Sequence, residues 1–281
     1  MNDLSLTSIA ASHLLTHLTD GVLIMTMNRP KKLNGWTLDM MDALGEAFVK
    51  ANTNEAVKAV ILTGTGNYYS AGVNLGGSLK LMHPKKLREL IVKNNKALFE
   101  LFLNCEKPLL IAVNGPAIGA SVTASTLANS IIASENATFS TPFAALGITP
   151  EGCSSVHFPR LMGEKNAQRM LGSEGWKPKA KEALEAGLVQ KVVPHEQLMD
   201  EAERIARDWV TSKKQRQFMA GSQLDDLKKV NARESEQLAD AFLGADFLRE
   251  QSRFLWSKKK YAPSVMFFSL WSLRPFWARL I

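Results

Sequence analysis

Two glycine-bearing loops are the segments best suited to chemistry in this chain of 281 residues. Residues 70–77 read SAGVNLGG and residues 113–121 read VNGPAIGAS, and each follows an apolar, strand-like segment. Small residues let a ligand approach main-chain N–H groups closely, and a helix start leaves such groups unpaired. One donor from each loop could therefore stabilise an oxygen that gains negative charge during a reaction. The alternative is that both segments are ordinary glycine turns.

Several other kinds of chemistry are disfavoured. Residues 147–154, GITPEGCS, have the glycine spacing of a phosphate-binding loop, but Cys153 replaces the lysine and Pro150 lacks a backbone donor. The sequence contains neither a Gly-x-Ser-x-Gly segment nor an HExxH segment, and its five histidines are scattered. We therefore expect no nucleotide hydrolase, no serine hydrolase and no metal site.

Composition excludes further classes of protein. The 34 Lys and Arg against 27 Asp and Glu give a formal charge of +7, with 46% hydrophobic residues, as in ordinary globular proteins. No apolar run approaches the ~20 residues of a membrane-spanning helix. Cys105 and Cys153 are too few for a disulfide framework, and the first residues lack a basic secretory start. We expect a reducing intracellular compartment.

The basic clusters near Lys213 and Lys258 have few aromatic residues among them, so we interpret them as solvated helix faces. Such clusters can also bind a phosphate-rich small ligand or a nucleic-acid backbone. Of these partners we expect no nucleic acid.

The elements that would position the loops alternate between strand and helix. Apolar segments typical of buried strands lie at 22–27, 57–62, 109–113 and 188–193. Helical periodicity follows Thr37, a good capping residue, and Pro84, a good first residue of a helix. This alternation predicts an α/β fold with buried parallel strands.

After Pro194 the pattern becomes charged and helical, so we expect a core over residues 1–200 and a helical region over 201–281. Its last residues, 265–281, carry five aromatic side chains and only two arginines. This aromatic tail is too short and interrupted to span a bilayer. We favour docking on its own domain or a neighbouring subunit over contact with a membrane surface.

Five ordered segments also resemble one known family. They are NRPKKLNGW at 28–36, SAGVNL at 70–75, AVNGPAIGAS at 112–121, ATFSTPFAALGITPEGCSS at 137–155 and EAGLVQKVVP at 185–194. In order and spacing they resemble the crotonase, or enoyl-CoA hydratase/isomerase, family. The resemblance implies a crotonase-like ββα spiral core with a helical C-terminal subdomain, a homotrimer or hexamer, and an acyl-CoA thioester as ligand. It implies no separate cofactor, because coenzyme A is part of the substrate.

The resemblance also implies roles for individual residues. The oxyanion hole maps onto the main-chain N–H groups of Ala71 and Ala120. The segment that cradles coenzyme A maps onto Lys31, Lys32, Leu33 and Asn34, whose lysines can meet phosphates. The remaining substrate-binding positions are Ser70, Gly72, Asn74, Leu75, Gly119 and Phe143.

The acidic residues distinguish the reactions of this family. The two glutamates of its hydratases map onto Thr123 and Phe143, and neither can act as an acid or base. Glu151 instead resembles the single catalytic glutamate of peroxisomal-type Δ3,Δ2-enoyl-CoA isomerases. From the residues alone, Thr149, Pro150 and Glu151 fit a helix start equally well.

The resemblance therefore implies an isomerase of fatty-acid metabolism, such as β-oxidation, that converts 3-enoyl-CoA to trans-2-enoyl-CoA by a one-glutamate proton shuttle. The alternatives are an enoyl-CoA hydratase or dienoyl-CoA isomerase, including a step in secondary metabolism, and a non-catalytic acyl-CoA-binding scaffold. We expect a peroxisomal location from the family branch, with cytoplasm as the alternative, because residues 278–281 are not an SKL-type terminus.

Overall fold

The computed structural model describes residues 4–73 and 82–281, and the predicted α/β class is confirmed. In these residues the main sheet has the strand order β1-β2-β3-β4-β6-β8, in which β1 is antiparallel to β2 and every other pair is parallel. Its strands are β1 Leu14–Thr19, β2 Val22–Met27, β3 Ala59–Gly64, β4 Leu109–Val113, β6 Ser130–Ser134 and β8 Lys191–Val193. A second, parallel pair is formed by β5 Ala117–Ile118 and β7 Phe139–Ser140.

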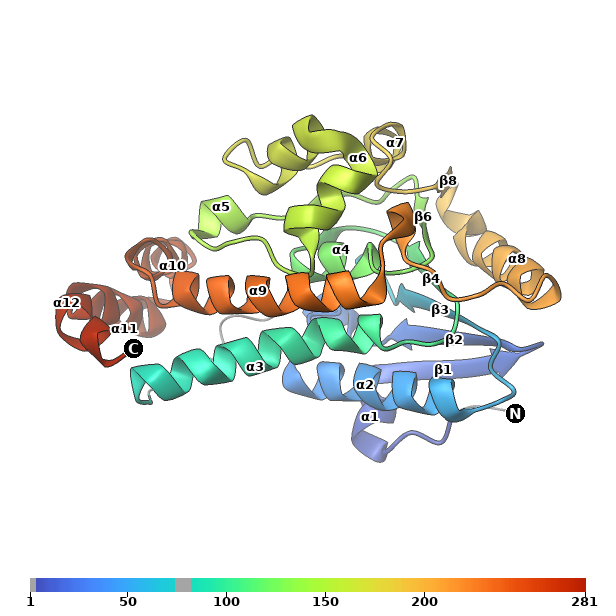
Figure 1. Cartoon of the computed structure of the whole chain (residues 1–281), viewed down its shortest axis with the longest axis horizontal. Helices are drawn as coiled ribbons and strands as arrows, with labels where there is room; N and C mark the ends of the chain where they lie inside the picture. Colours follow the sequence, from blue (N-terminus) through green and yellow to red (C-terminus); the bar gives the residue numbers. More distant parts are fainter. Residues whose placement is uncertain (1–3, 74–81) are drawn as a thin grey trace.

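Helices surround the sheet and make up the C-terminal region (Figure 1). Those before residue 190 are α1 Ser8–His13, α2 Leu38–Thr53, α3 Pro84–Leu103, α4 Ala120–Ser125, α5 Phe143–Leu146, α6 Ser154–Leu171 and α7 Ala180–Glu185. Those after it are α8 Leu198–Thr211, α9 Leu224–Phe242, α10 Ala245–Ser257, α11 Tyr261–Ser272 and α12 Arg274–Trp277.

The ends of several elements follow the predicted local signals. The side chain of Thr37 accepts a hydrogen bond from the N–H of Met40 and caps α2, and Pro84 is the first residue of α3. Strand β3, however, begins two residues after the predicted start, because the N–H of Val57 closes a turn onto the carbonyl of Asn54.

The two faces of the sheet are buried in separate apolar clusters. Val60 and Leu62 of β3 face the large core under α2 and α3, whereas Ile61 faces α8 with Leu110 of β4. Side chains alternate along a strand, so a strand covered on both faces is expected to be largely apolar, as Ala59 to Leu62 of β3 are. Residue 200 lies inside α8, and the division of the chain there stays a prediction.

The C-terminal helices lie at one end of the molecule, beyond the paired helices α3 and α9 (Figure 1). Phe267 of the aromatic tail is buried against α10, while Phe268 is 54% exposed and Phe276 is 77% exposed. The tail therefore docks in part on its own chain. No helix of the described part of the chain is long and apolar enough to cross a bilayer.

Arg216 ties the end of α3 to the loop after α4. Its guanidinium donates to the carbonyls of Phe102 at 3.2 Å and Cys105 at 3.0 Å, and it also reaches the carbonyl of Leu127. The last carbonyls of a helix have no partner within the helix. Arg216 supplies the missing donors and joins α3 to the segment that follows one of the glycine-bearing loops.

We predict that Arg216→Met destabilises the fold by about 2–4 kcal/mol, because several buried carbonyl groups lose a charged donor. The measurement is urea unfolding followed by circular dichroism. Arg204→Met on the exposed side of α8 is the matched control and should leave the midpoint unchanged. Equal midpoints for both variants would contradict this role of Arg216.

Candidate active site

The loops after β3 and β4 meet at the carboxyl edge of the sheet. The carbonyl of Ser70 accepts hydrogen bonds from the N–H of Ile118 at 3.0 Å and the hydroxyl of Ser121 at 3.1 Å. Gly72 has a φ of +72°, and a Cβ atom there would lie 2.3 Å from the carbonyl oxygen of Ile118. Only glycine permits this approach, so the sequence of the first loop determines how closely the loops pack.

An apolar cavity of about 460 Å³ lies beside these loops. Of the predicted site residues, Ala71, Gly119, Ala120, Phe143 and Glu151 line it. Most of its wall is formed by the side chains of Met41, Leu87, Leu90, Ile91, Leu98, Leu146, Leu238, Phe242 and Phe247, from α2, α3, α5, α9 and α10. Such a cavity fits a hydrocarbon chain and excludes water from reacting groups.

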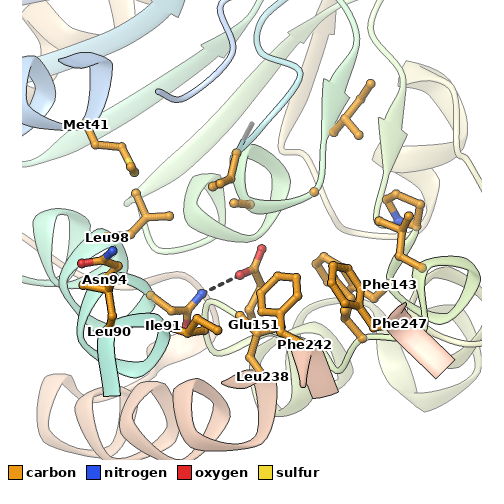
Figure 2. A pocket seen from close by; sticks show the side chains of 18 of the residues that line it. Met41, Leu90, Ile91, Asn94, Leu98, Phe143, Glu151, Leu238, Phe242 and Phe247 are labelled. Atoms are coloured by element: carbon orange, nitrogen blue, oxygen red, sulfur yellow. Dashed lines mark hydrogen bonds between the residues drawn. The ribbon is translucent and has the colours of Figure 1, made fainter. Parts of the chain in front are cut away.

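Glu151 lies in this apolar surrounding, next to Phe143, Phe242 and Phe247 (Figure 2). It is 7% exposed, and its Oε2 accepts a hydrogen bond of 2.6 Å from Nδ2 of Asn95. Burial raises its pKa from 4.5 to about 7, the hydrogen bond from Asn95 opposes this change, and the nearby Glu234 adds to it. A carboxyl group with this pKa can accept and return a proton near neutral pH.

The helix-start interpretation of Glu151 is wrong. Helix α6 begins at Ser154, and Gly152 and Cys153 before it both have a φ of +65°. Glu151 therefore lies in a turn ahead of the helix. Its carbonyl accepts from the hydroxyl of Ser154 at 2.7 Å, which holds the backbone of the turn while the carboxyl group reaches the cavity.

The main-chain donors differ from expectation in one loop. The N–H of Ala71 donates to the carbonyl of Leu33 at 2.9 Å. This donor is therefore already paired, and the oxyanion role predicted for Ala71 does not agree with the structure. Among the described residues, the N–H groups of Val73 and Ala120 have no acceptor, and both residues line the cavity. Sequence reasoning missed Val73, because the pairing of the Ala71 N–H with the Leu33 carbonyl is visible only in the tertiary structure.

Two of the predicted ligand-binding residues are used inside the protein. Asn34 is fully buried, accepts from the N–H of Arg29 at 2.9 Å and donates to the carbonyls of Thr65 and Tyr68. Ser70 is also fully buried, and its hydroxyl donates to the carbonyl of Asn34 at 2.8 Å. Both side chains shape the loops and have no capacity left for direct contact with a ligand.

Lys31, Lys32, Leu33 and Gly72 lie outside the cavity lining. Lys31 and Lys32 form a short 3-10 turn ahead of the exposed Leu33, which keeps their ammonium groups accessible. The N–H of Gly72 donates to the hydroxyl of Ser70. Asn74 and Leu75 lie outside the described residues.

The positions predicted to lack the hydratase acids carry a hydroxyl and a phenyl ring. The hydroxyl of Thr123 donates to the carbonyl of Ala120 at 3.2 Å, and Phe143 forms part of the cavity wall. Among the described residues that line the cavity, Glu151 is the only acidic one. Within residues 4–73 and 82–281, no three His, Cys, Asp or Glu side chains are grouped to hold a metal ion.

Asn95 is a second functional residue that sequence reasoning missed. Its carbonyl Oδ1 accepts from the hydroxyl of Ser235 at 2.9 Å, which fixes the orientation of the amide toward Glu151. A signal existed, because Asn95 stands four residues after Ile91 and three before Leu98, on the apolar face of α3. A polar residue in such a stripe needs a buried partner.

Comparison with known proteins finds a matching family and several relatives. Residues 17–253 match the family model described as Enoyl-CoA hydratase/isomerase. The human protein named Enoyl-CoA delta isomerase 2 is 41% identical over 62% of this chain and 44% of its own length. The mouse protein named Enoyl-CoA delta isomerase 3, peroxisomal, is 39% identical over 62% of this chain and 55% of its own. The chain thus spans about half the length of these relatives.

A further relative and a solved structure cover more of their own length. The Clostridium acetobutylicum protein named Short-chain-enoyl-CoA hydratase is 32% identical over 85% of this chain and 92% of its own. The crystal structure of an enoyl-CoA hydratase/isomerase from Pseudoalteromonas atlantica has a TM-score of 0.75 and 28% identity, covering 87% of this chain and 97% of that one.

We predict that Asn95→Leu moves the titration midpoint of Glu151 upward, because the ionised carboxylate loses the hydrogen bond that stabilises it. The midpoint is measured by ¹³C NMR of glutamate labelled at Cδ, with the signal assigned by its loss in Glu151→Gln. The matched control is Asn94→Leu, since Asn94 also lines the cavity but has no hydrogen bond to Glu151. A midpoint that moves downward in Asn95→Leu would contradict the assigned hydrogen bond.

Proposed function

Because the chain belongs to the enoyl-CoA hydratase/isomerase family, we propose that it is an isomerase that converts 3-enoyl-CoA to trans-2-enoyl-CoA. The observation that carries the proposal is a single buried carboxyl group, Glu151, in an apolar cavity that Val73 and Ala120 also line, with N–H groups that have no acceptor among the described residues. Moving a double bond by one position requires one proton to leave one carbon and return to another. One carboxyl group is enough for both steps.

The substrate would bind with its acyl chain in the cavity and its thioester carbonyl at the loops. The N–H groups of Val73 and Ala120 would donate to the carbonyl oxygen, with the acyl chain between α3 and α9. The ammonium groups of Lys31 and Lys32 would meet the phosphates of coenzyme A. No separate cofactor is required by this chemistry.

Glu151 acts first as the base. Its carboxylate takes a proton from C2, the electron pair of the C–H bond moves into the C2–C1 bond, and the carbonyl π electrons move to oxygen. The resulting dienolate is stabilised by the two N–H groups, each worth about 3–4 kcal/mol in comparable sites. Asn95 holds Oε2, so Oε1 is the oxygen that transfers the proton.

Glu151 then acts as the acid. It gives the same proton to C4, and the carbonyl re-forms while the double bond shifts to C2–C3. Atoms and charge balance over the two steps, because the carboxyl group is regenerated as a carboxylate. The raised pKa of about 7 suits both steps, since the proton is neither held too tightly nor too weakly near neutral pH.

The composition of the cavity favours isomerisation over hydration. Addition of water across a double bond requires groups that activate the water and also supply a proton. Thr123 and Phe143 stand where the resemblance places the two hydratase acids; Phe143 is part of the apolar cavity wall, and Thr123 is fully buried. A hydratase and a non-catalytic acyl-CoA-binding scaffold are therefore the alternatives that the experiment must separate.

We predict that purified protein converts trans-3-hexenoyl-CoA to a conjugated product, seen as rising absorbance, and that Glu151→Gln lowers kcat by about 10²- to 10⁴-fold. Coenzyme A binding by Glu151→Gln should stay intact, because the carboxyl group lies in the acyl cavity. Glu236→Gln, an exposed position on α9, is the control for loss of an acidic residue.

Two results would contradict the proposal. Binding of acyl-CoA by the wild type without turnover would favour the scaffold. Efficient hydration of trans-2-hexenoyl-CoA would favour the hydratase and show that Glu151 has another role.

Location and assembly follow as further parts of the proposal. The name of the mouse relative includes peroxisomal, which supports a peroxisomal role in fatty-acid metabolism for this chain as well. We expect an N-terminal fluorescent fusion to collect in peroxisomes, and a uniform cytoplasmic signal would contradict this. A homotrimer or hexamer is expected by light scattering, since apolar side chains such as Phe276 stay exposed in one chain.

A further inference from the structure

We propose that Glu234 is the positioning residue for Glu151: it holds the turn that carries Glu151, and its ionised form repels the carboxylate of Glu151. This inference rests on the proposed function, in which Glu151 is the catalytic base. Glu234 lies on α9 and does not line the cavity, so it acts on the reaction only through Glu151.

Glu234 binds the turn directly. It is fully buried, and its Oε2 accepts from the N–H of Cys153 at 2.6 Å. Its Oε1 accepts from the N–H of Ser155 at 2.9 Å and from the hydroxyl of Ser155 at 2.5 Å. Three donors therefore converge on one carboxyl group, and they come from both sides of the first residue of α6.

The turn needs such an anchor because its backbone has an unfavourable conformation at Cys153. Cys153 has a φ of +65°, a conformation that residues with a Cβ rarely adopt and that persists only where the surroundings enforce it. Besides its N–H bond to Glu234, its thiol donates to the carbonyl of Leu227 at 3.2 Å. Both anchors belong to α9, so α9 determines the path of the backbone just after Glu151.

The opposite side of the turn is closed by packing. A Cβ atom at Gly152 would lie 2.4 Å from Cε1 of Phe99 and 2.6 Å from the hydroxyl oxygen of Thr123. The turn cannot move toward α3 or α4, and Glu234 prevents it from moving away. The carboxyl group of Glu151 is therefore held at one place in the cavity.

Burial raises the pKa of Glu234 to about 7, and its hydrogen bonds from Ser155 and Cys153 oppose this change. Glu234 accepts three hydrogen bonds and Glu151 accepts one, and each donor stabilises the ionised form. Three other groups face the two carboxyl groups. Arg233 on α9 lowers the pKa of Glu234, the turn carries the buried thiol of Cys153, and α3 carries the neutral amide of Asn95. In its ionised form Glu234 adds to the effect of burial and raises the pKa of Glu151 further.

A charge behind the base makes it hold a proton more strongly. Two buried carboxylates repel each other, so an ionised Glu234 favours the protonated form of Glu151. Without that charge Glu151 would be a weaker base at the same position. Removal of the charge must therefore lower the titration midpoint of Glu151, an effect that a purely structural anchor would not have.

The test measures Glu151 directly, without relying on turnover. The midpoint of Glu151 is followed by ¹³C NMR at glutamate Cδ in the wild type, Glu234→Gln and Glu234→Asp. We expect Glu234→Gln to lower the midpoint by about one pH unit, since it removes the charge. Glu234→Asp keeps the charge and should keep the midpoint near the wild-type value, while its shorter side chain loosens the turn and lowers kcat.

A milder variant covers the case in which Glu234→Gln does not fold. Ser155→Ala removes one donor from Glu234, so less of Glu234 is ionised, and the midpoint of Glu151 should move in the same direction by a smaller amount. Glu236→Gln, on the same helix but exposed, is the matched control and should leave the midpoint unchanged.

Clear outcomes overturn the proposal. An unchanged midpoint in Glu234→Gln, or in Ser155→Ala where that variant alone folds, would show that Glu234 does not act on Glu151 by charge. An equal drop in Glu234→Asp would show the same. If the wild type lacks isomerase activity but the midpoints shift as expected, the proposed function fails while the coupling of the two carboxyl groups stands.

Discussion

The burial of one carboxyl group without a cation is the constraint on which this site depends. Glu151 has Asn95 as its hydrogen-bond partner, and an apolar wall surrounds the rest of the side chain. Burial disfavours the charged form, which raises the pKa into the range useful for a proton shuttle. Two hydrogen-bonded contacts orient the carboxyl group of Glu151. Asn95 on α3 donates to the carboxyl group itself, and Glu234 on α9 holds the turn that carries it.

The second requirement is a pair of donors at the same cavity, and the parallel sheet provides it. The loops after β3 and β4 leave the sheet at one edge, where Gly72 allows the first loop to contact the backbone of Ile118. Hydrogen bonds within the described part of the loops use the N–H groups of Ala71, Gly72 and Ile118. The N–H groups of Val73 and Ala120 have no acceptor among residues 4–73 and 82–281.

Family membership determines the fold, whereas the acidic residues of the cavity bear on which reaction takes place there. Membership accounts for the crotonase-like fold, which the match over residues 17–253 and the similar crystal structure confirm. It does not determine which reaction the cavity performs, since relatives named as isomerases and as a hydratase both match. The residues at positions 123, 143 and 151 address that question, because the number of acids in the cavity limits the proton transfers available.

The sequence by itself determined the α/β class, the two glycine loops and the capping of α2 by Thr37, because each depends on local patterns. The candidate acid Glu151 came from the family resemblance, since the local pattern fitted a helix start equally well. The tertiary structure alone decided the partners of that acid. Asn95 and Glu234 come from helices 56 residues before Glu151 and 81 residues after Cys153, and no local pattern fixes such distances. It also decided that the N–H of Ala71 is paired, since its acceptor is the carbonyl of Leu33 from another loop, while the N–H of Val73 has no acceptor in the described part of the chain.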